Sequence, residues 1–220
     1  MIIAIDGFSA CGKSTLAKQL ADSLSFVYID TGAMYRAATL YFIENQIDYN
    51  REEAVEEGLK NVNIVFKRIN NSNVTFLNEI DVESAIRSMR VAQHVSNVAA
   101  IPAVRHAMVA IQREVGELHS VVMDGRDIGT VVFPNARLKL FLTASLQKRV
   151  ERRYFELLNK GKSISKEEIQ ANLTERDHID STRAHSPLRQ AEDAVVIDNT
   201  NLSIEEQFEM TLTLAKLRST

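Results

Sequence analysis

The sequence has little of what several protein classes require. It contains one cysteine in 220 residues, which excludes an internal disulfide framework. No apolar run approaches the roughly 20 residues that span a bilayer. Asp6 ends the N-terminal apolar stretch after five residues, so we expect no signal peptide and a cytoplasmic protein. The net charge of −3 excludes a generally basic surface for nucleic acid or anionic membranes.

What is present suits a folded enzyme-sized domain. A chain of 220 residues can bury a large core and fits one domain with appendages. The apolar fraction of 45% and the charged fraction of 25% are ordinary for globular proteins. The chain has no internal repeats, and none of its segments has a composition typical of disorder.

One motif predicts phosphate binding. Gly7–Ser14 reads G-x-x-x-x-G-K-S, follows the apolar run Ile2–Ile5 and opens into a helical pattern at Leu16, Leu20 and Leu24. A strand, a glycine-containing loop and a helix in this order form a phosphate-binding loop. A chance match in a glycine turn is the alternative, and the flanking strand and helix make it the poorer explanation.

The chemistry of such a loop assigns roles to its residues. Backbone N–H groups and the helix N-terminus attract phosphate, Lys13 reaches the β- and γ-phosphates, and Ser14 holds Mg²⁺. Cys11 lies near the helix N-terminus and Lys13, so we expect a reactive thiolate that ATP protects. The nucleotide-binding residues expected are Gly7, Phe8, Ser9, Ala10, Cys11, Gly12, Lys13, Ser14 and Thr15.

Continuous apolar runs predict strands that are buried on both faces, as in a parallel sheet covered by helices. These runs are Ile2–Ile5, Phe26–Ile29, Val121–Met123, Leu138–Leu142 and Ala194–Ile197. Asp30, Asp124 and Asp198 follow three of them. Ligands of parallel sheets bind outside the carboxyl ends of strands, so Asp30 and Asp124 are site candidates. Asp198 precedes Asn-Thr-Asn, which indicates a turn.

Three further segments differ from this pattern. Residues from about 61 to 82 alternate around a polar centre and predict a small antiparallel hairpin. A helical stretch is expected around Val91–Gly116. Residues of about 149–183 are rich in charge and predict a mobile helical lid, which includes Lys160 and Lys162.

Arginine and aspartate recur together in three segments, 30–36, 124–130 and 176–183. Helical spacing would align Arg176, Asp180 and Arg183 on one face. Each cluster alone could be a solvated ion pair of small value. Three clusters beside one phosphate loop favour an anion-recognition site instead.

The basic residues of the predicted lid leave two interpretations open. Lys148, Arg149, Arg152 and Arg153 could contact a triphosphate, or they could form a solvated helix face.

Taken together, these motifs resemble the bacterial cytidylate kinases of the nucleoside monophosphate kinase group. The resemblance rests on IDGFSACGKST, YIDTGAMYR, the PAVRHAM helix, DGRDIGTVVFP, ERDxxDSTR and DAVVIDNTNLS, and it runs over nearly the whole chain. It implies an α/β P-loop NTPase fold with a five-stranded parallel sheet flanked by helices, a helical lid and a small antiparallel insert in the monophosphate-binding region. It implies one domain, 1–220, with core 1–30, 118–148 and 184–220, a monophosphate-binding region 31–117 and the lid.

The resemblance also implies an activity. A kinase of this family transfers the γ-phosphoryl group of ATP to CMP, and dCMP is expected as a second acceptor. ATP and Mg²⁺ are the implied cofactors, and we expect a monomer. A GTPase switch is disfavoured because the chain lacks N-K-x-D; another nucleotide or small-metabolite kinase stays the alternative.

Roles carried over by the resemblance fall into three sets, each suited to its chemistry. Guanidinium groups match phosphate geometry. A carboxylate accepts hydrogen bonds from a ribose hydroxyl or from the exocyclic amine of cytosine, and the ring acceptors of cytosine need donors. The acceptor-phosphate residues, catalytic together with Lys13, are Arg36, Arg126 and Arg183. The ribose residues are Arg176 and Asp180. The base-reading residues are Ser96, Arg105 and Asp127. Thr31 supplies a substrate-site hydroxyl, and Asp124 holds Mg²⁺ through water.

Overall fold

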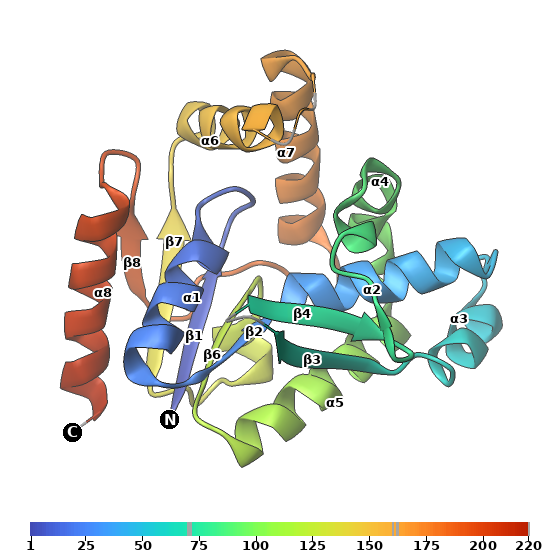
Figure 1. Ribbon diagram of the computed structural model, residues 1–220, viewed down its shortest axis with the longest axis horizontal. Coiled ribbons are helices and arrows are strands. Elements are labelled where there is room, and N and C mark those ends of the chain that lie inside the picture. Colours follow the sequence, from blue (N-terminus) through green and yellow to red (C-terminus); the bar gives the residue numbers. More distant parts are fainter. Residues whose placement is uncertain (70–71, 160, 162, 220) are drawn as a thin grey trace. The chain divides into compact units, whose positions relative to one another are not determined.

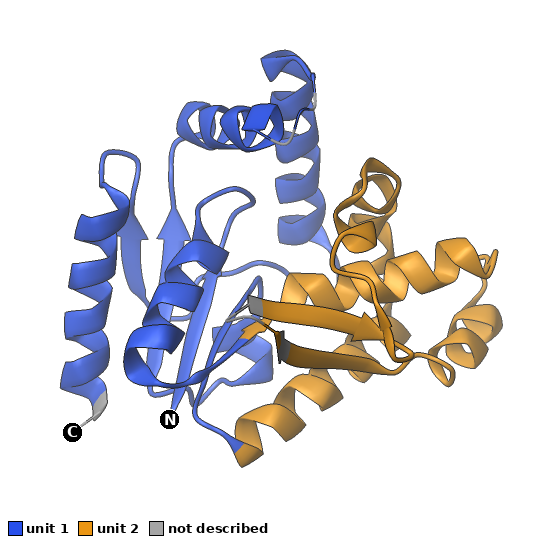
Figure 2. Cartoon of the chain, in the orientation of Figure 1, with its two compact units in different colours: residues 1–28, 119–220 blue, residues 29–118 orange. Residues whose placement is uncertain are grey.

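The chain is described in a computed structural model at residues 1–69, 72–159, 161 and 163–219. Two parts of the predicted segments lie outside the described residues: Asn70 and Asn71 of the hairpin, and Lys160 and Lys162 of the lid. The chain divides into two compact units, residues 1–28 with 119–220 and residues 29–118 (Figure 2).

The first unit holds the phosphate loop and most of the large sheet (Figure 1). Its strands are β1 (Ile2–Gly7), β6 (Val121–Gly125), β7 (Leu138–Thr143) and β8 (Val195–Asp198). Its helices are α1 (Lys13–Leu24), α6 (Leu146–Asn159), α7 (Lys166–Thr182) and α8 (Ile204–Ser219), with one π-helical turn, η2 (Ile128–Val132). The strand β2 (Val27–Asp30) crosses the boundary between the units.

The large sheet has five strands in the order β2-β6-β1-β7-β8. β1 pairs in parallel with β6, where Ile3 faces Val122, and with β7, where Ile3 faces Leu138. β7 pairs in parallel with β8. The five apolar runs therefore form the five strands of a parallel sheet, and the predicted fold class is confirmed.

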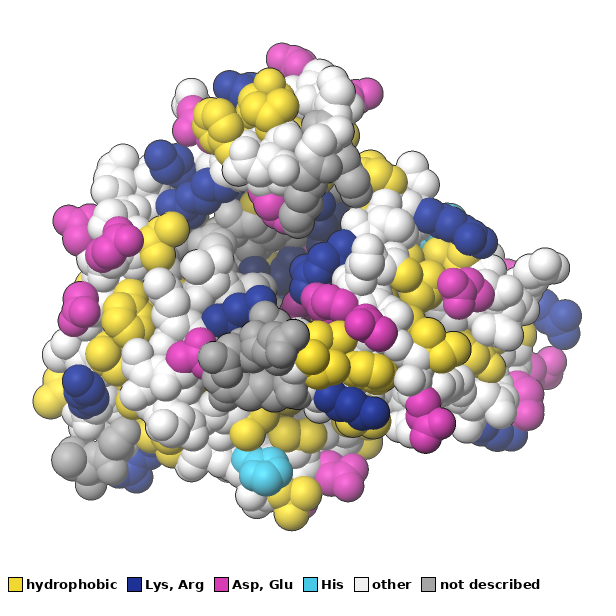
Figure 3. Space-filling model, viewed as in Figure 1, with side chains coloured by type: hydrophobic (Ala, Val, Ile, Leu, Met, Phe, Trp, Pro, Cys, Tyr) yellow, Lys and Arg dark blue, Asp and Glu magenta, His cyan; other side chains and the backbone are white. Residues whose placement is uncertain are grey.

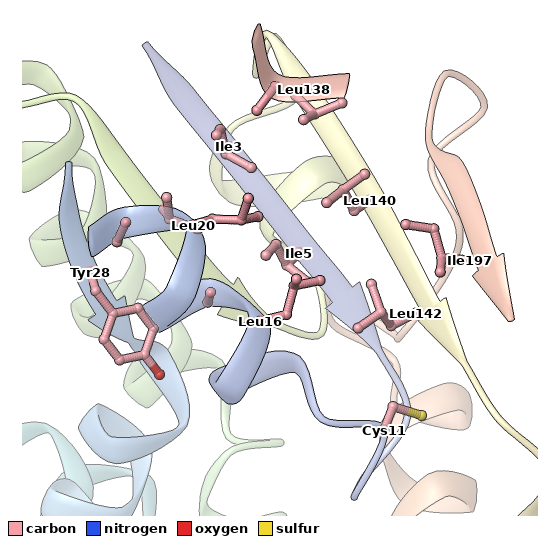
Figure 4. Packing of buried hydrophobic residues seen from close by; sticks show 14 of the residues in the cluster. Ile3, Ile5, Cys11, Leu16, Leu20, Tyr28, Leu138, Leu140, Leu142 and Ile197 are labelled. Atoms are coloured by element: carbon pink, nitrogen blue, oxygen red, sulfur yellow. The ribbon is translucent and has the colours of Figure 1, made fainter. Parts of the chain in front are cut away.

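Helices α1 and α8 pack against this sheet in one hydrophobic cluster, and Figure 4 shows the part that α1 contributes. Ile3, Ile5 and Leu140 of the strands are buried together with Leu16 and Leu20 of α1. Ala215 of α8 joins the same cluster. The period of four between the leucines of α1 places them on one face of the helix, so the helix that begins at the phosphate loop is anchored in the core.

The two helices of the predicted lid segment, α6 and α7, have a small core of their own. Val150 and Leu157 of α6 are buried with Ile169 and Leu173 of α7. A reciprocal capping box starts α7: the Ser165 hydroxyl accepts from the Glu168 N–H at 3.1 Å, and the Glu168 carboxylate accepts from the Ser165 N–H. Such a cap satisfies two N–H groups that a helix start leaves open. The lid segment is helical, as predicted.

The described residues of the second unit, 29–69 and 72–118, form four helices, a short turn and a small sheet. The helices are α2 (Thr31–Glu44), α3 (Glu52–Leu59), α4 (Met89–Val98) and α5 (Pro102–Leu118), and the 3-10 turn is η1 (Ala85–Arg87). The strands are β3 (Ile64–Ile69), β4 (Ser72–Leu77) and β5 (Ile80–Asp81). They form an antiparallel sheet in the order β3-β4-β5.

The small sheet has one strand more than the predicted hairpin. Asn78 and Glu79 both adopt left-handed backbone conformations, with φ of 48° and 68°. Two such residues in succession form the tight turn that suits an antiparallel hairpin, and Leu77 pairs with Ile80 across it. Strand β5 was not predicted because Asn-Glu lacks the glycine that usually marks this turn.

The helical stretch expected around Val91–Gly116 is two helices, not one. The first, α4, ends at Val98, and the second begins at Pro102. Proline disfavours helical backbone in the residue before it and is well suited to the first helical position. Pro102 therefore interrupts the periodicity and starts α5.

Among the described residues, the structure contains no helix of the length and apolarity needed to cross a membrane.

Candidate active site

The phosphate loop joins β1 to α1 through a backbone that curls on itself. Ala10 and Gly12 have left-handed conformations, with φ of 60° and 85°. Gly12 is also the N-cap of α1. A Cβ atom at Gly7 would lie 2.0 Å from the Leu142 carbonyl oxygen, so this position admits no side chain. The motif that the sequence contains thus forms the turn and helix start on which anion binding depends.

Lys13 is the first residue of α1 and only 6% exposed. Its ammonium group donates to the Phe8 carbonyl at 2.7 Å, back across the loop. Burial, and to a smaller extent the positive charge of Arg126, lower the pKa of Lys13 to about 8. A phosphate next to this ammonium would add negative charge to that of Asp124 and Asp180 and favour the protonated form of Lys13.

Ser14 and Asp124 lie together at the end of the sheet. The Ser14 hydroxyl donates to one Asp124 carboxylate oxygen at 2.8 Å, and the Tyr28 hydroxyl donates to the other at 2.8 Å. Asp124 is 4% exposed. A serine hydroxyl beside a carboxylate offers the oxygen ligands that Mg²⁺ prefers, with room in its coordination for phosphate oxygens. The residues present therefore fit this ion.

Arg126 lies between the phosphate loop and α7. Its Nε donates to the Asp180 carboxylate at 2.7 Å, and its Nη2 donates to the Ser9 hydroxyl at 2.8 Å. Burial lowers the pKa of the Arg126 guanidinium, but Asp180 outweighs this and raises it above its ordinary value. Burial likewise raises the pKa of Asp180, but Arg126 and then Arg183 hold it below its ordinary range. The pair stays charged.

Arg183 lies one residue beyond the end of α7, with extended backbone at φ −57° and ψ 143°. Its Nη1 lies 3.4 Å from Asp180, and its Nη2 lies 3.8 Å from Asp127. The sequence predicted that Arg176, Asp180 and Arg183 share one helix face, but the helix ends at Thr182, before Arg183. The arginine still reaches the same cluster, and the charge of Arg176 also lowers the pKa of Asp180.

Asp6 holds the segment that follows Asp127. Its carboxylate accepts from the Ile128 N–H at 2.8 Å and from the Gly129 N–H at 2.7 Å. Burial raises the pKa of Asp6 to about 6, although these two N–H groups oppose the change. Asp6 thus ties the end of β1 to the π-helical turn next to Arg126 and Asp127, a role that the sequence did not suggest.

Asp177 is a second residue that the sequence left without a role. Its carboxylate accepts from the Ser9 N–H at 3.1 Å and pairs with the Arg149 guanidinium. Arg149 also donates to the Ser9 carbonyl at 3.3 Å. The only sequence signal for this contact is that Asp177 lies inside the arginine–aspartate motif of α7. The lid helices are therefore bonded directly to the phosphate loop.

The basic residues of α6 divide between two faces. Arg149 and Arg152 are turned inward and donate to groups of the first unit. Lys148 and Arg153 are 43% and 30% exposed and pair with Glu151 and Glu156 on the same helix. Figure 3 shows charged and hydrophobic side chains mixed on the visible surface of this helix. Of these four basic residues, only Lys148 and Arg153 therefore lie on a solvated helix face.

Asp30 and Arg36 lie at the start of α2 in the second unit. The Asp30 carboxylate caps the helix by accepting from the Ala33 N–H at 2.9 Å, and it pairs with Arg36 at 2.9 Å. Burial raises the pKa of Asp30, but Arg36 and then Arg87 outweigh it and lower the pKa. Gly32 is helical and forms no tight turn of its own. A Cβ there would lie 2.9 Å from the Arg36 guanidinium, so glycine leaves room for the ion pair.

The other predicted residues of the second unit are buried in its helices. Thr31 begins α2, Ser96 lies in α4, and Arg105 in α5 is 2% exposed. Arg105 stacks on the Tyr35 ring at 5.2 Å and donates to the Ala99 carbonyl at 3.0 Å. At least one of its donors is therefore engaged within the unit.

The prediction that Cys11 has a reactive thiol is wrong. Its side chain is fully buried in the hydrophobic cluster with Leu142 and Leu16 (Figure 4). Burial raises the pKa of the thiol above its ordinary value, and Lys13 opposes this only in part. The sequence places Cys11 near a cation and a helix start, but only the packing reveals that its side chain faces the core.

The predicted residues thus fall into two groups, one in each unit. The first unit brings together the phosphate loop, Asp124, Arg126, Asp127, Asp180 and Arg183. The second contains Thr31, Arg36, Ser96 and Arg105.

Comparison with known proteins gives a consistent result. A family model described as "Cytidylate kinase" matches residues 3–217. The cytidylate kinase of Phocaeicola vulgatus is 53% identical over 214 residues, covering 93% of this chain and 92% of that protein. The cytidylate kinase of Cytophaga hutchinsonii is 48% identical over 217 residues, covering 98% and 93%.

Solved structures of distant sequence share the fold. A shikimate kinase from Bacteroides thetaiotaomicron has a TM-score of 0.51 at 13% identity and covers 100% of this chain and 99% of its own. An uncharacterised protein from Eubacterium ventriosum has a TM-score of 0.53 at 11% identity, with 98% of both chains covered. At such identities the likeness concerns the fold alone.

Proposed function

The chain belongs to the cytidylate kinase family, and on this premise we propose that it transfers the γ-phosphoryl group of ATP to CMP and dCMP, giving ADP and CDP or dCDP. The enzyme is proposed to act in the cytoplasm, in pyrimidine nucleotide metabolism. One observation of the structure carries the proposal beyond the resemblance: a phosphate loop and a cluster of paired arginines are bonded to each other through Ser9 and Arg126.

The reaction needs no general base, because the attacking oxygen belongs to a phosphate that is already anionic. The difficulty is to hold two highly charged groups in line and to neutralise them. Lys13 and Arg126 are proposed to provide fixed positive charge for this purpose. Both are largely withdrawn from water, where such charges act most strongly.

Mg²⁺ is proposed to bind at Ser14 and, through water, at Asp124. When bound, the ion neutralises phosphate charge and orients the phosphate oxygens. The two side chains already lie within one hydrogen bond of each other, so their positions need little adjustment.

The acceptor is proposed to be recognised by the residues that the resemblance assigns. Guanidinium groups of Arg36, Arg126 and Arg183 would hold the phosphate of CMP, and Asp180 with Arg176 the ribose. Ser96, Arg105 and Asp127 would read the cytosine. Asp127 and Arg183 already face each other, which supports a shared polar site for base and phosphate.

The experiment that tests the proposal is a coupled assay of ADP formation with a panel of nucleoside monophosphates and small-metabolite acceptors. We expect CMP and dCMP to give the highest kcat/KM. Lys13→Ala should retain the fold and lose about 10²-fold or more in kcat, as expected for a preorganised charge. A higher kcat/KM with another acceptor, or near-normal turnover of the variant, would contradict the proposal.

Base reading has a separate test. Asp127→Asn keeps the shape of the side chain but adds a donor where the cytosine amine needs an acceptor. Because polar sites reject a mismatched partner strongly, this variant should lose CMP activity and show a smaller CMP-to-UMP ratio of kcat/KM. An unchanged ratio would mean that Asp127 does not read the base.

A further inference from the structure

Asn199 lies directly after β8, where the sequence indicates only a turn. It is 2% exposed. Its side-chain amide donates to the Cys11 carbonyl of the phosphate loop at 2.8 Å and to the Gln207 side chain. Its backbone N–H donates to the Thr143 carbonyl at 2.9 Å. Asn199 therefore joins the phosphate loop to the end of β7 and to α8.

Arg152 of α6 fixes the orientation of this amide. Its two terminal nitrogens donate to the Asn199 side-chain oxygen and to the Asn199 backbone oxygen, both at 2.8 Å. A guanidinium group can only donate hydrogen bonds. The amide oxygen must therefore face Arg152, which turns the amide nitrogen toward Cys11.

The Cys11 carbonyl belongs to the same peptide plane as the Gly12 N–H. All described peptide bonds are trans, so the carbonyl and the N–H point in opposite directions. Gly12 adopts φ of 85°, and glycine allows its peptide to rotate more freely than other residues would. A bond that holds the carbonyl on one side therefore also decides where the N–H points.

We propose that Asn199 is a positioning residue of the phosphate-transfer reaction. It holds the Cys11–Gly12 peptide so that the Gly12 N–H faces the nucleotide phosphates, and Arg152 keeps the amide of Asn199 in the required orientation. This inference rests on the proposed function of the loop as the ATP site. It gives Arg152 a role through Asn199 and not through direct contact with the nucleotide.

The first test compares two asparagines. Asn199→Ala removes the bond to Cys11, and Asn199→Asp puts a carboxylate oxygen against the Cys11 carbonyl. Asn201→Asp makes the same chemical change at an exposed position two residues away. We expect ADP affinity, measured by calorimetry without CMP, to fall about tenfold in Asn199→Ala, the effect of about one lost hydrogen bond, and at least as much in Asn199→Asp. Asn201→Asp should bind ADP like the wild type.

Steady-state kinetics of the same variants separate positioning from general damage. Asn199→Ala should raise the KM for ATP about tenfold and leave the KM for CMP within about twofold. Lower thermal stability with unchanged ADP affinity and unchanged KM for ATP would identify Asn199 as merely structural and overturn the proposal.

Arg152→Leu tests the orientation step without altering the loop or Asn199. We expect a weaker loss of ADP affinity than in Asn199→Ala, and no further loss when the two substitutions are combined, because both act through one contact. Additive losses would mean that Arg152 binds the nucleotide itself and would overturn its proposed role. If the Asn199 variants do not fold, unchanged ADP affinity in Arg152→Leu overturns the proposal.

ADP binding without CMP also separates this inference from the proposed function. A wild-type protein that binds ADP but does not phosphorylate CMP would contradict the proposed activity. The comparison of ADP affinities would still decide the role of Asn199.

Discussion

Two strand ends in this molecule carry the same residue type in different surroundings. Asp30 ends β2 and is held by the guanidinium groups of Arg36 and Arg87, at 2.9 and 3.7 Å. Asp124 near the end of β6 accepts from the hydroxyls of Ser14 and Tyr28. The sequence treats the two aspartates alike, because each follows a buried apolar run.

These different partners give the two aspartates different roles. Cationic partners neutralise Asp30, so its function is to hold Arg36 and to cap α2. The hydroxyls of Ser14 and Tyr28 carry no formal charge and orient the Asp124 carboxylate. Its negative charge acts on Lys13 and Arg126 and is proposed to attract Mg²⁺ as well. The surrounding side chains, and not the position at a strand end, decide what each carboxylate can bind.

The substitution with the largest expected effect tests directly whether Asp124 and Asp30 have different roles. Asp124→Asn should lower kcat about 10²-fold, since it removes the charge proposed to hold Mg²⁺ near the phosphates. Asp30→Asn should keep the helix cap, because asparagine caps as well as aspartate. It should therefore act mainly on the KM for CMP, through a less fixed Arg36. Steady-state kinetics of both variants at several Mg²⁺ concentrations measure the difference.

Two controls sharpen this comparison. Raising Mg²⁺ should recover part of the activity of Asp124→Asn and none of that of Asp30→Asn. If the two variants lose kcat equally and respond alike to Mg²⁺, the two carboxylates do the same work and the distinction is wrong.

A third aspartate, Asp6 at the end of β1, is expected to affect the free energy of unfolding. Burial raises the pKa of Asp6 from 3.8 to about 6. Its contribution to the free energy of unfolding is therefore fully present below pH 3.8 and is lost as the pH rises through about 6. Relative to Asp6→Asn, the wild type should lose about 1–3 kcal/mol of stability over this range. Urea unfolding of both proteins at pH 4 and pH 7 measures the change.

The matched control for Asp6 is Glu175→Gln, an exposed acid on α7. The difference in stability between this control and the wild type should vary much less with pH. A difference between Asp6→Asn and the wild type that is the same at both pH values would contradict the raised pKa.

The smallest expected effect concerns two residues of the phosphate loop with opposite surroundings. Lys13 bonds to the Phe8 carbonyl of the loop, whereas Cys11 lies in the core. Cys11→Ala should leave kcat within about twofold and cost about 1 kcal/mol of stability for a small buried group. The chain has a single cysteine, so a thiol-reactive dye reports on this residue alone. The thiol should stay unreacted in the native protein and react fully in denaturant.

Fast labelling of the native protein that ATP prevents would contradict the buried position of Cys11. It would restore the view, based on sequence alone, that this thiol is exposed and activated.

The sequence by itself determined the family, the phosphate loop and the five strands of the large sheet. These features depend on residues that are close along the chain: a glycine-lysine-serine motif, continuous apolar runs and a strand–loop–helix order. Local signals also fail in recognisable ways, since Asn78-Glu79 makes a turn without glycine and Pro102 divides a helical stretch.

Only the tertiary structure decided which polar groups meet. The Ser9 N–H bonds to Asp177, 168 positions away, and the Asn199 amide bonds to the Cys11 carbonyl across 188 positions. No local periodicity encodes such contacts, because the fold of the whole chain brings their partners together. Packing also turned the Cys11 thiol into the core and gave Asp30 and Asp124 different partners. The sequence supplies the chemical groups, and the three-dimensional arrangement determines the charge, hydrogen bonding and access to water that each group has.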